Sequence, residues 1–282
     1  MRKIILLLLA FITISGSIFA ELSTGHLTNP PALVPMKTVL APHKSSGCNY
    51  LVLGDNLPWG SSSVTDILAG NGETFSTATS ATFPGLNFAD YDVIIVLSDQ
   101  VPGFHTVFAA NFPKFVTFVT NGGTLEVHAA TCGWNSPCGY SVVLPGGVHT
   151  HEQYDPYNVV VDPLNPITAG VTSPFYGNYA SHGYFSGLVP GTEIITTAQS
   201  NGEPTTIQYH YGSGIVTGTT VTYEAACGFG LGWQGCTMLH NNLNYACSHA
   251  QAAIPTLSQW GLIILGCVLL GFGTFYILKM RG

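Results

Sequence analysis

The segment Phe88-Ala-Asp-Tyr-Asp-Val-Ile-Ile-Val-Leu97 contains the clearest strand of this sequence. Residues 93–97 are consecutive aliphatic side chains with no polar residue among them. An uninterrupted apolar run of this length indicates a strand whose two faces are both buried, as in a parallel sheet that is covered by helices. The segment therefore predicts an α/β fold built on a parallel sheet.

The segments on both sides of this strand alternate between strand and helix patterns. Three segments precede it. They are an apolar run closed by Gly54-Asp55, a stretch that begins at three serines and ends at Gly70, and a short β-prone run. A stretch with phenylalanines at mostly helical spacing, ended by Asn121-Gly122-Gly123, and a further strand come after it. This alternation is typical of βαβ units in a doubly wound sheet. The expected elements are strands at 50–54, 74–78 and 124–130 and helices at 61–69 and 104–120.

After Cys132 the pattern changes to short strands and loops. Gly212 and Gly214 predict a hairpin turn between two of these strands. A final helix is expected at 237–246, and further strands at 148–154, 158–161, 193–198, 205–211 and 215–223. Together, these strands and helices predict a flavodoxin-like, doubly wound, mostly parallel sheet with a β-rich C-terminal half. They form one domain over residues 49–250.

Five segments in this order resemble the class I glutamine-amidotransferase-like fold, especially its ThuA-like branch. They are Leu51-Val-Leu-Gly-Asp55, Tyr91-Asp-Val-Ile-Ile-Val96, residues 115–126 (FVTFVTNGGTLE), Asp162-Pro-Leu-Asn-Pro-Ile-Thr168 and Tyr211-Gly-Ser-Gly-Ile-Val216. The resemblance implies a cysteine nucleophile on a turn between strand and helix, and a histidine base after a late strand. Cys132 stands near the expected place, but the glycine two residues before it is missing, and Thr222-Tyr-Glu-Ala225 has no histidine. We therefore expect Cys132 to be a disulfide partner.

The two ends of the chain carry export and membrane signals. Residues 1–20 have the charged start and apolar middle of a secretory signal peptide, and residues 21–48 are proline-rich and predict an extended leader. Residues 262–278 are apolar or small, and Lys279 and Arg281 follow them. This predicts a transmembrane helix with a cytoplasmic end, so that the body of the protein lies outside.

The octamer that precedes the apolar run, IPTLSQWG, resembles the IPTL-CTERM sorting signal, a relative of PEP-CTERM in Gram-negative bacteria. The resemblance implies a protein exported by the Sec machinery, held transiently in the inner membrane, and processed by an exosortase for the outer surface or the extracellular space. The alternative is a simple membrane-anchored periplasmic protein. The signal would span residues 254–282, and its motif residues are Ile254, Pro255, Thr256, Leu257, Trp260 and Gly261.

Charge and cysteine content fit an exported protein. All fourteen Asp and Glu but only three of the seven Lys and Arg lie within residues 21–253, which gives that region a formal net charge of −11. Such a surface repels nucleic acid, so nucleic acid is not an expected partner. Six cysteines in an oxidising compartment predict up to three disulfides. Proximity favours Cys132 with Cys138 and Cys227 with Cys236, which leaves Cys48 with Cys247.

Two sets of residues could bind a cation. His149 and His151 lie at i and i+2, which places them on one face of a strand, and His128, Glu126 or His182 could complete a zinc site. Asp155 and Asp162 could instead contribute to a calcium site, although no EF-hand spacing is present. No other cofactor is expected.

A catalytic interpretation rests on His182, which lies in a Ser-His-Gly turn, with Glu126 and Glu224 as partners. The alternative is an imidazole that binds the backbone of a loop. Aromatic residues could line a groove for a surface glycan or peptide: Trp134, Tyr140, Tyr154, Tyr157, Tyr176 and Tyr179. We expect an ectodomain that binds a ligand or has a structural role, with an extracellular hydrolase, metal-assisted or acting through His and Glu, as the competing hypothesis.

Overall fold

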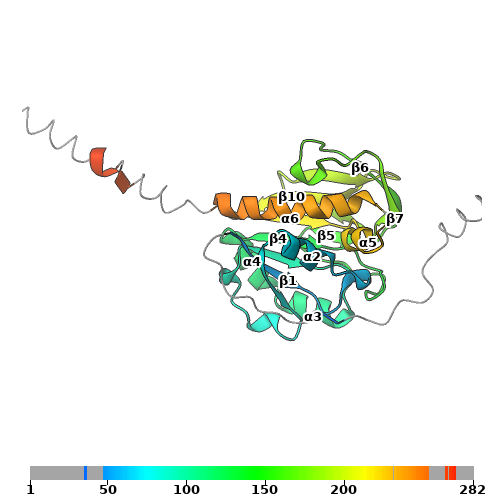
Figure 1. The fold of residues 1–282 in the computed structure, drawn as a ribbon, viewed down its shortest axis with the longest axis horizontal. Coiled ribbons are helices and arrows are strands. Elements are labelled where there is room, and N and C mark those ends of the chain that lie inside the picture. The colour runs from blue at the N-terminus through cyan, green and yellow to red at the C-terminus, as the bar shows by residue number, and fades with distance from the viewer. Residues whose placement is uncertain (1–34, 37–46, 231, 254–263, 266, 271–282) are drawn as a thin grey trace, which may run out of the picture.

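The computed structural model describes residues 35–36, 47–230, 232–253, 264–265 and 267–270. The predicted signal peptide, most of the predicted leader, the sorting octamer and most of the predicted membrane span lie outside these residues. Within the described residues, no helix is both long and apolar enough to cross a membrane. The described part of the chain is an α/β domain (Figure 1).

Five parallel strands form one half of the main sheet. They lie in the order β2-β1-β3-β4-β11, which is the strand order of flavodoxin-like doubly wound sheets. Every residue of β3 is buried, as its aliphatic run predicts. The bounds are β1 Asn49–Leu53, β2 Thr74–Ala78, β3 Val93–Val96, β4 Thr124–His128 and β11 Gly214–Thr219.

Four antiparallel strands continue the sheet beyond β11, in the order β10-β9-β6-β7. Strands β10 and β11 form the predicted hairpin, with Tyr211 opposite Gly214. A separate pair, β5 with β8, lies outside the main sheet. The bounds are β5 His149–His151, β6 Asp155–Val160, β7 Phe175–Ser181, β8 Tyr184–Ser186, β9 Glu193–Ala198 and β10 Pro204–Tyr211.

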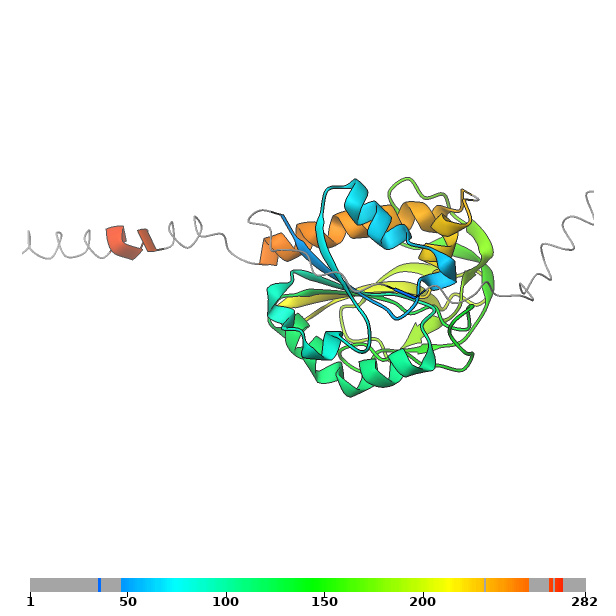
Figure 2. The same ribbon diagram turned by 60° about the horizontal axis from the view of Figure 1, so that its bottom comes forward.

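Helices cover both faces of the sheet (Figure 2). α2 (Ser63–Gly70) and α6 (Gln234–Ala253) pack on one face through Val64, Leu68, Met238, Leu239 and Leu243. α3 (Pro102–Ala110) and α4 (Phe112–Thr120) pack on the other face through Phe104, Phe108, Phe115 and Phe118. Each buried phenylalanine contributes roughly 1.5–3 kcal/mol through the apolar surface that it removes from water.

Three disulfides tie the ends of these elements together. Cys48, directly before β1, is bonded to Cys247 in α6. Cys227 in α5 (Tyr223–Gly228) is bonded to Cys236 near the start of α6. Cys132 and Cys138 close the loop that follows β4. These are the three pairs that sequence spacing favours.

Several predicted elements differ from the structure in their limits. The helix expected at 104–120 is two helices that meet at Asn111, because Pro113 has no backbone N–H and favours the first turn of a new helix. The strand expected at 215–223 ends at Thr219, and α5 follows it. Of the strand expected at 148–154, only residues 149–151 form a strand, β5. Strands β7 and β8 were not predicted from the sequence.

Candidate functional site

Three turns with strained backbones gather at the carboxyl edge of the parallel strands. Trp59, Asp99 and Cys132 follow β1, β3 and β4, and their φ angles are 48°, 52° and 58°. A left-handed conformation in a residue other than glycine costs on the order of 1–3 kcal/mol and is common at functional sites. This edge is also where doubly wound sheets bind their ligands. The strained turns therefore mark the candidate site.

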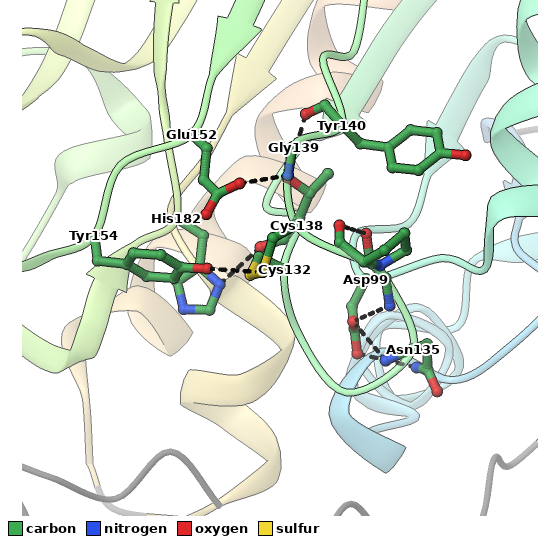
Figure 3. Close-up of a disulfide and its surroundings, with 12 residues drawn as sticks. Asp99, Cys132, Asn135, Cys138, Gly139, Tyr140, Glu152, Tyr154 and His182 are labelled. Carbon is green, nitrogen blue, oxygen red and sulfur yellow. Dashed lines mark hydrogen bonds between the residues drawn. A yellow bond between two sulfur atoms is a disulfide. The ribbon is translucent and has the colours of Figure 1, made fainter.

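The Asp99 carboxylate connects these turns (Figure 3). It accepts hydrogen bonds from the backbone N–H groups of Trp59 at 3.1 Å and of Asn135 and Ser136 at 2.9 Å, and from the Asn135 side chain at 3.0 Å. Burial raises the pKa of Asp99 to about 6, although the backbone N–H bonds oppose this shift. Asp99 has 1% of its surface exposed, so it organises the loops from inside.

The Cys132–Cys138 disulfide closes the loop whose N–H groups bind Asp99, and Glu152, Tyr154 and His182 lie around the disulfide (Figure 3). The Tyr154 hydroxyl lies 3.6 Å from the sulfur of Cys138, and the Glu152 carboxylate accepts a hydrogen bond from the N–H of Gly139. Cys132 is buried, whereas Cys138 is exposed. Because its sulfur is bonded to Cys138, Cys132 is not available as a nucleophile.

The backbone conformation of Cys132 was not predicted from the sequence, whereas its role as a disulfide partner was. The absence of a glycine two residues earlier argues against a sharp elbow, yet Cys132 adopts a φ of 58°. Ala130 occupies the glycine position and is fully buried. A single methyl group fits there, so the backbone reaches the left-handed conformation without glycine.

His182 is held against the same loop. Its Nδ1 lies 2.9 Å from the carbonyl oxygen of Thr131 and so donates a hydrogen bond to it. Its ring packs edge-on against Tyr154 and Trp59, at centroid distances of 4.9 and 5.7 Å. These contacts match the interpretation of His182 as an imidazole that binds the loop backbone.

Glu126 and Glu224 belong to a different, deeply buried cluster around His128. His128 Nδ1 lies 2.7 Å from Glu224 Oε1, and the hydroxyl of Ser98 donates to Glu224 Oε2 at 2.7 Å. Glu126 Oε2 lies 3.8 Å from His128 Nε2 and accepts a 3.0 Å hydrogen bond from Asn242 in α6. His182 is not part of this cluster, so the three predicted catalytic candidates are divided between two sites.

The charges of the buried cluster follow from its geometry. Burial alone lowers the pKa of His128, but the charges of Glu224 and Glu126 and the hydrogen bond to Glu224 raise it to about 9. Burial raises the pKa of Glu224, yet the charge and hydrogen bond of His128 outweigh burial, and the net pKa is lowered. Burial raises the pKa of Glu126, and His128 only partly opposes this. The cluster is thus an imidazolium–carboxylate pair beside Glu126, a second buried carboxyl group whose pKa is raised.

Sequence reasoning considered His128 only as a metal ligand and missed its pairing with Glu224. One signal was present, since Glu126 and His128 alternate along β4 and must share a face. The position of Glu224 was not visible, because it enters from α5, 96 residues along the chain from His128.

The predicted zinc ligands are divided among three places. His149 and His151 are on β5, whereas His128 and Glu126 are in the core and His182 contacts the disulfide loop. The Asp155 carboxylate accepts hydrogen bonds from the N–H groups of Tyr157 and Ser200, and that of Asp162 accepts one from Leu164. Both aspartates therefore cap turns.

The aromatic residues expected to line one groove occupy several places. Trp134 packs on Phe229, Tyr140 stacks on His105, and Tyr154 contacts His182. Tyr157 and Tyr176 form an exposed pair on β6 and β7, with ring centroids 5.0 Å apart. The side chain of Tyr179 lies outside the part of the chain that the structure describes. We call Trp134, Tyr140 and Tyr154 the aromatic rim of the disulfide loop.

One comparison with known sequences concerns the residues that follow α6. Residues 252–274 match the family model described as the IPTL-CTERM motif. The chain carries this sorting signal. The motif implies export and surface sorting, and the three disulfides fit an oxidising compartment outside the cytoplasm.

Other comparisons concern the domain. An uncharacterized protein of Clostridium acetobutylicum is 30% identical over 177 residues, which are 62% of this chain and 18% of that protein. The chain therefore spans less than a fifth of that relative's length.

Solved structures with similar folds include amidotransferase-like proteins. A ThuA-like protein from Parabacteroides merdae is 16% identical, covers 72% of this chain and 90% of its own, and has a TM-score of 0.41. A glutamine amidotransferase from Thermotoga maritima is 8% identical, covers 74% and 94%, and has a TM-score of 0.45. A cytoplasmic protein of Salmonella typhimurium is 14% identical, covers 70% and 98%, and has a TM-score of 0.48. None of these likenesses assigns an activity to this chain.

Proposed function

We propose that this chain is an exported protein, sorted to the cell surface by an exosortase that reads residues 254–282, and that its α/β domain binds a ligand there without catalysis. The IPTL-CTERM match carries the first part of the proposal. The bonded state of Cys132 carries the second, because it occupies the turn where a nucleophile would act.

The chemistry of the two clusters supports a binding role. Glu126 and Glu224 have at most 1% of their surface exposed, so neither carboxylate reaches a substrate. The Nδ1 of His182 donates to the carbonyl oxygen of Thr131, and Trp59 and Tyr154 pack against its ring. A hydrolase acting through His182 and Glu126 would need these two groups in one accessible site.

The aromatic rim supplies the proposed ligand surface. Tyr154 is 37% exposed and its hydroxyl lies against the Cys138 sulfur, and Trp134 within the loop and Tyr140 directly after it are half-buried. Aromatic rings offer large, rigid contact areas at low entropic cost, and they stack on apolar faces of sugars and peptides. We propose a glycan or peptide of the cell surface as the ligand class.

Sorting is tested by replacing Trp260 with alanine in the full chain expressed in its exosortase-bearing host. We expect the variant to keep its C-terminal tail and to accumulate as a larger, membrane-associated form, whereas the wild type is shortened and reaches the surface. Gln259→Ala, at a neighbouring variable position of the octamer, is the control. Intact mass and cell fractionation provide the readout. If the wild type itself keeps its tail and stays in the membrane fraction, the protein is a simple anchored periplasmic protein. If Trp260→Ala is shortened like the wild type, Trp260 is not part of the signal that is read.

The bonded state of Cys132 is tested by thiol alkylation of the exported protein under non-reducing conditions. We expect no adduct on any of the six cysteines between residues 47 and 253, because the structure places all six in disulfides. Peptide mapping assigns any adduct to its residue. An adduct on Cys132 in folded protein would reopen the nucleophilic interpretation.

A further inference from the structure

Two imidazoles stand side by side on the small β5–β8 sheet. Thr150 between them is buried, and its hydroxyl accepts a hydrogen bond from the N–H of Val142. His149 and His151 therefore share the opposite face of the strand, where His149 is half-buried and His151 is exposed. Their ring centroids are 5.0 Å apart.

Both imidazoles direct the same nitrogen toward one point. Ser186, opposite His149 in the β5–β8 register, has its hydroxyl 3.1 Å from His149 Nε2 and 2.7 Å from His151 Nε2. The hydroxyl thus lies between two converging ring nitrogens. A metal ion bound by both nitrogens would occupy this neighbourhood, at about 2.0–2.1 Å from each for zinc.

The surroundings fix the orientation of both rings. His149 Nδ1 donates to the carbonyl oxygen of Gly147 at 3.0 Å, which leaves Nε2 with its lone pair. This backbone contact is the arrangement that orients metal-binding histidines. Gly187, at φ 68°, gives the ring room, since a Cβ there would lie 3.3 Å from it. The His151 ring stacks on Tyr184 at a centroid distance of 4.9 Å.

We propose that His149 and His151 form a binding site for one divalent transition-metal ion, with both Nε2 atoms as ligands and water completing the coordination. The Ser186 hydroxyl donates a hydrogen bond to His149 Nε2, so its oxygen accepts one from His151, which carries its proton on Nε2 in the metal-free protein. When the ion binds, this proton moves to His151 Nδ1, and the Ser186 hydroxyl leaves its contact with the two nitrogens. The imidazoles stay neutral, so no proton is released by the ligands.

Imidazole nitrogens select borderline metals, and affinity rises through Ni²⁺ to Cu²⁺, with Zn²⁺ below Cu²⁺. The net charge of −11 within residues 21–253 also attracts cations to the domain. Two other groups combine cysteines with a third donor: Cys227 and Cys236 with His240, and Cys132 and Cys138 with Glu152. All four cysteines are in disulfides, so their sulfurs are not thiolate ligands.

The test is a titration of Cu²⁺ and Zn²⁺ into the full chain, purified in mild detergent without a polyhistidine tag. We expect one equivalent of Cu²⁺ to bind, with weaker binding of Zn²⁺. His149→Gln and His151→Gln should each weaken Cu²⁺ binding at least ~10-fold, because one imidazole alone is a poor ligand set. His210→Gln on β10 and His240→Gln on α6, both exposed histidines, should leave the affinity unchanged.

Electron paramagnetic resonance of the Cu²⁺ complex gives an independent readout. Nitrogen hyperfine coupling from two imidazoles is expected in the wild type and from at most one in either β5 variant. Circular dichroism confirms that each variant is folded, and both substitutions lie on a solvent face. The proposal is overturned if the wild type binds no Cu²⁺, or if both β5 variants bind it as tightly as the wild type.

Discussion

Replacement of Glu224 with glutamine lowers the free energy of unfolding by about 3–5 kcal/mol, the cost of removing one partner from a buried ion pair. Glu224 is fully buried and provides the counter-charge of His128. The carboxamide leaves an uncompensated imidazolium or forces His128 to lose its proton inside the core. Urea denaturation measures the loss, and Glu203→Gln, in the turn before β10, is the matched control with an expected change within about 0.5 kcal/mol.

The same pair gives the protein a defined pH dependence. The pKa of His128 is raised to about 9 from its ordinary value, so its contribution to stability is complete below about pH 6.5 and is lost as pH rises through 9. The pKa of Glu224 is lowered, so its contribution is complete above about pH 4.3 and is lost at lower pH. His128→Gln should reduce the decline between about pH 6.5 and 9. An unchanged decline in that variant, or a loss below 1 kcal/mol in Glu224→Gln, contradicts this account.

Removal of the Cys48–Cys247 disulfide is the second large effect. The bond joins residues 199 apart, and closure of so long a loop restricts the unfolded chain by roughly 5 kcal/mol in the chain-entropy model. The Cys48→Ala, Cys247→Ala double variant should lose most of this free energy. Alanine is used rather than serine, because the side chain at position 48 has no exposed surface and a serine hydroxyl there would be buried.

The Cys227–Cys236 disulfide provides the comparison for this experiment. It joins residues only 9 apart, so its removal by the same two alanine substitutions should cost roughly 3 kcal/mol. Both double variants are measured by urea denaturation under oxidising conditions. Equal losses would show that loop closure does not govern the stability of this domain.

The parallel half of the fold was predictable because its residues carry local signals. The aliphatic run of β3 and the limits of β2 at Thr74 and Ala78 follow from composition alone. The limits of α3 and α4 depended on a single residue, Pro113. Strands β7 and β8 had no such signal, because their pairing with β6 and β5 comes from tertiary contacts.

The site was less predictable than the fold for a physical reason. Spacing along the chain predicted the pairing of Cys132 with Cys138, and strand periodicity could have placed Glu126 beside His128. Neither rule reports contacts between distant segments, such as Asp99 with Asn135 or His128 with Glu224. Left-handed backbone at Trp59 and Cys132 was also invisible, since neither residue favours it, and an aspartate such as Asp99 adopts it only occasionally.

The Cys48–Cys247 bond has a mechanical consequence for a domain tethered through the residues after Ala253. The Cα atoms of these cysteines are 5.7 Å apart, and Cys48 leads directly into β1, inside the parallel sheet. A pulling force on the tail would pass from the end of α6 through the covalent bond into β1. The part of α6 that precedes Cys247 would therefore be held to the start of β1 by a covalent bond and would not be peeled from the sheet.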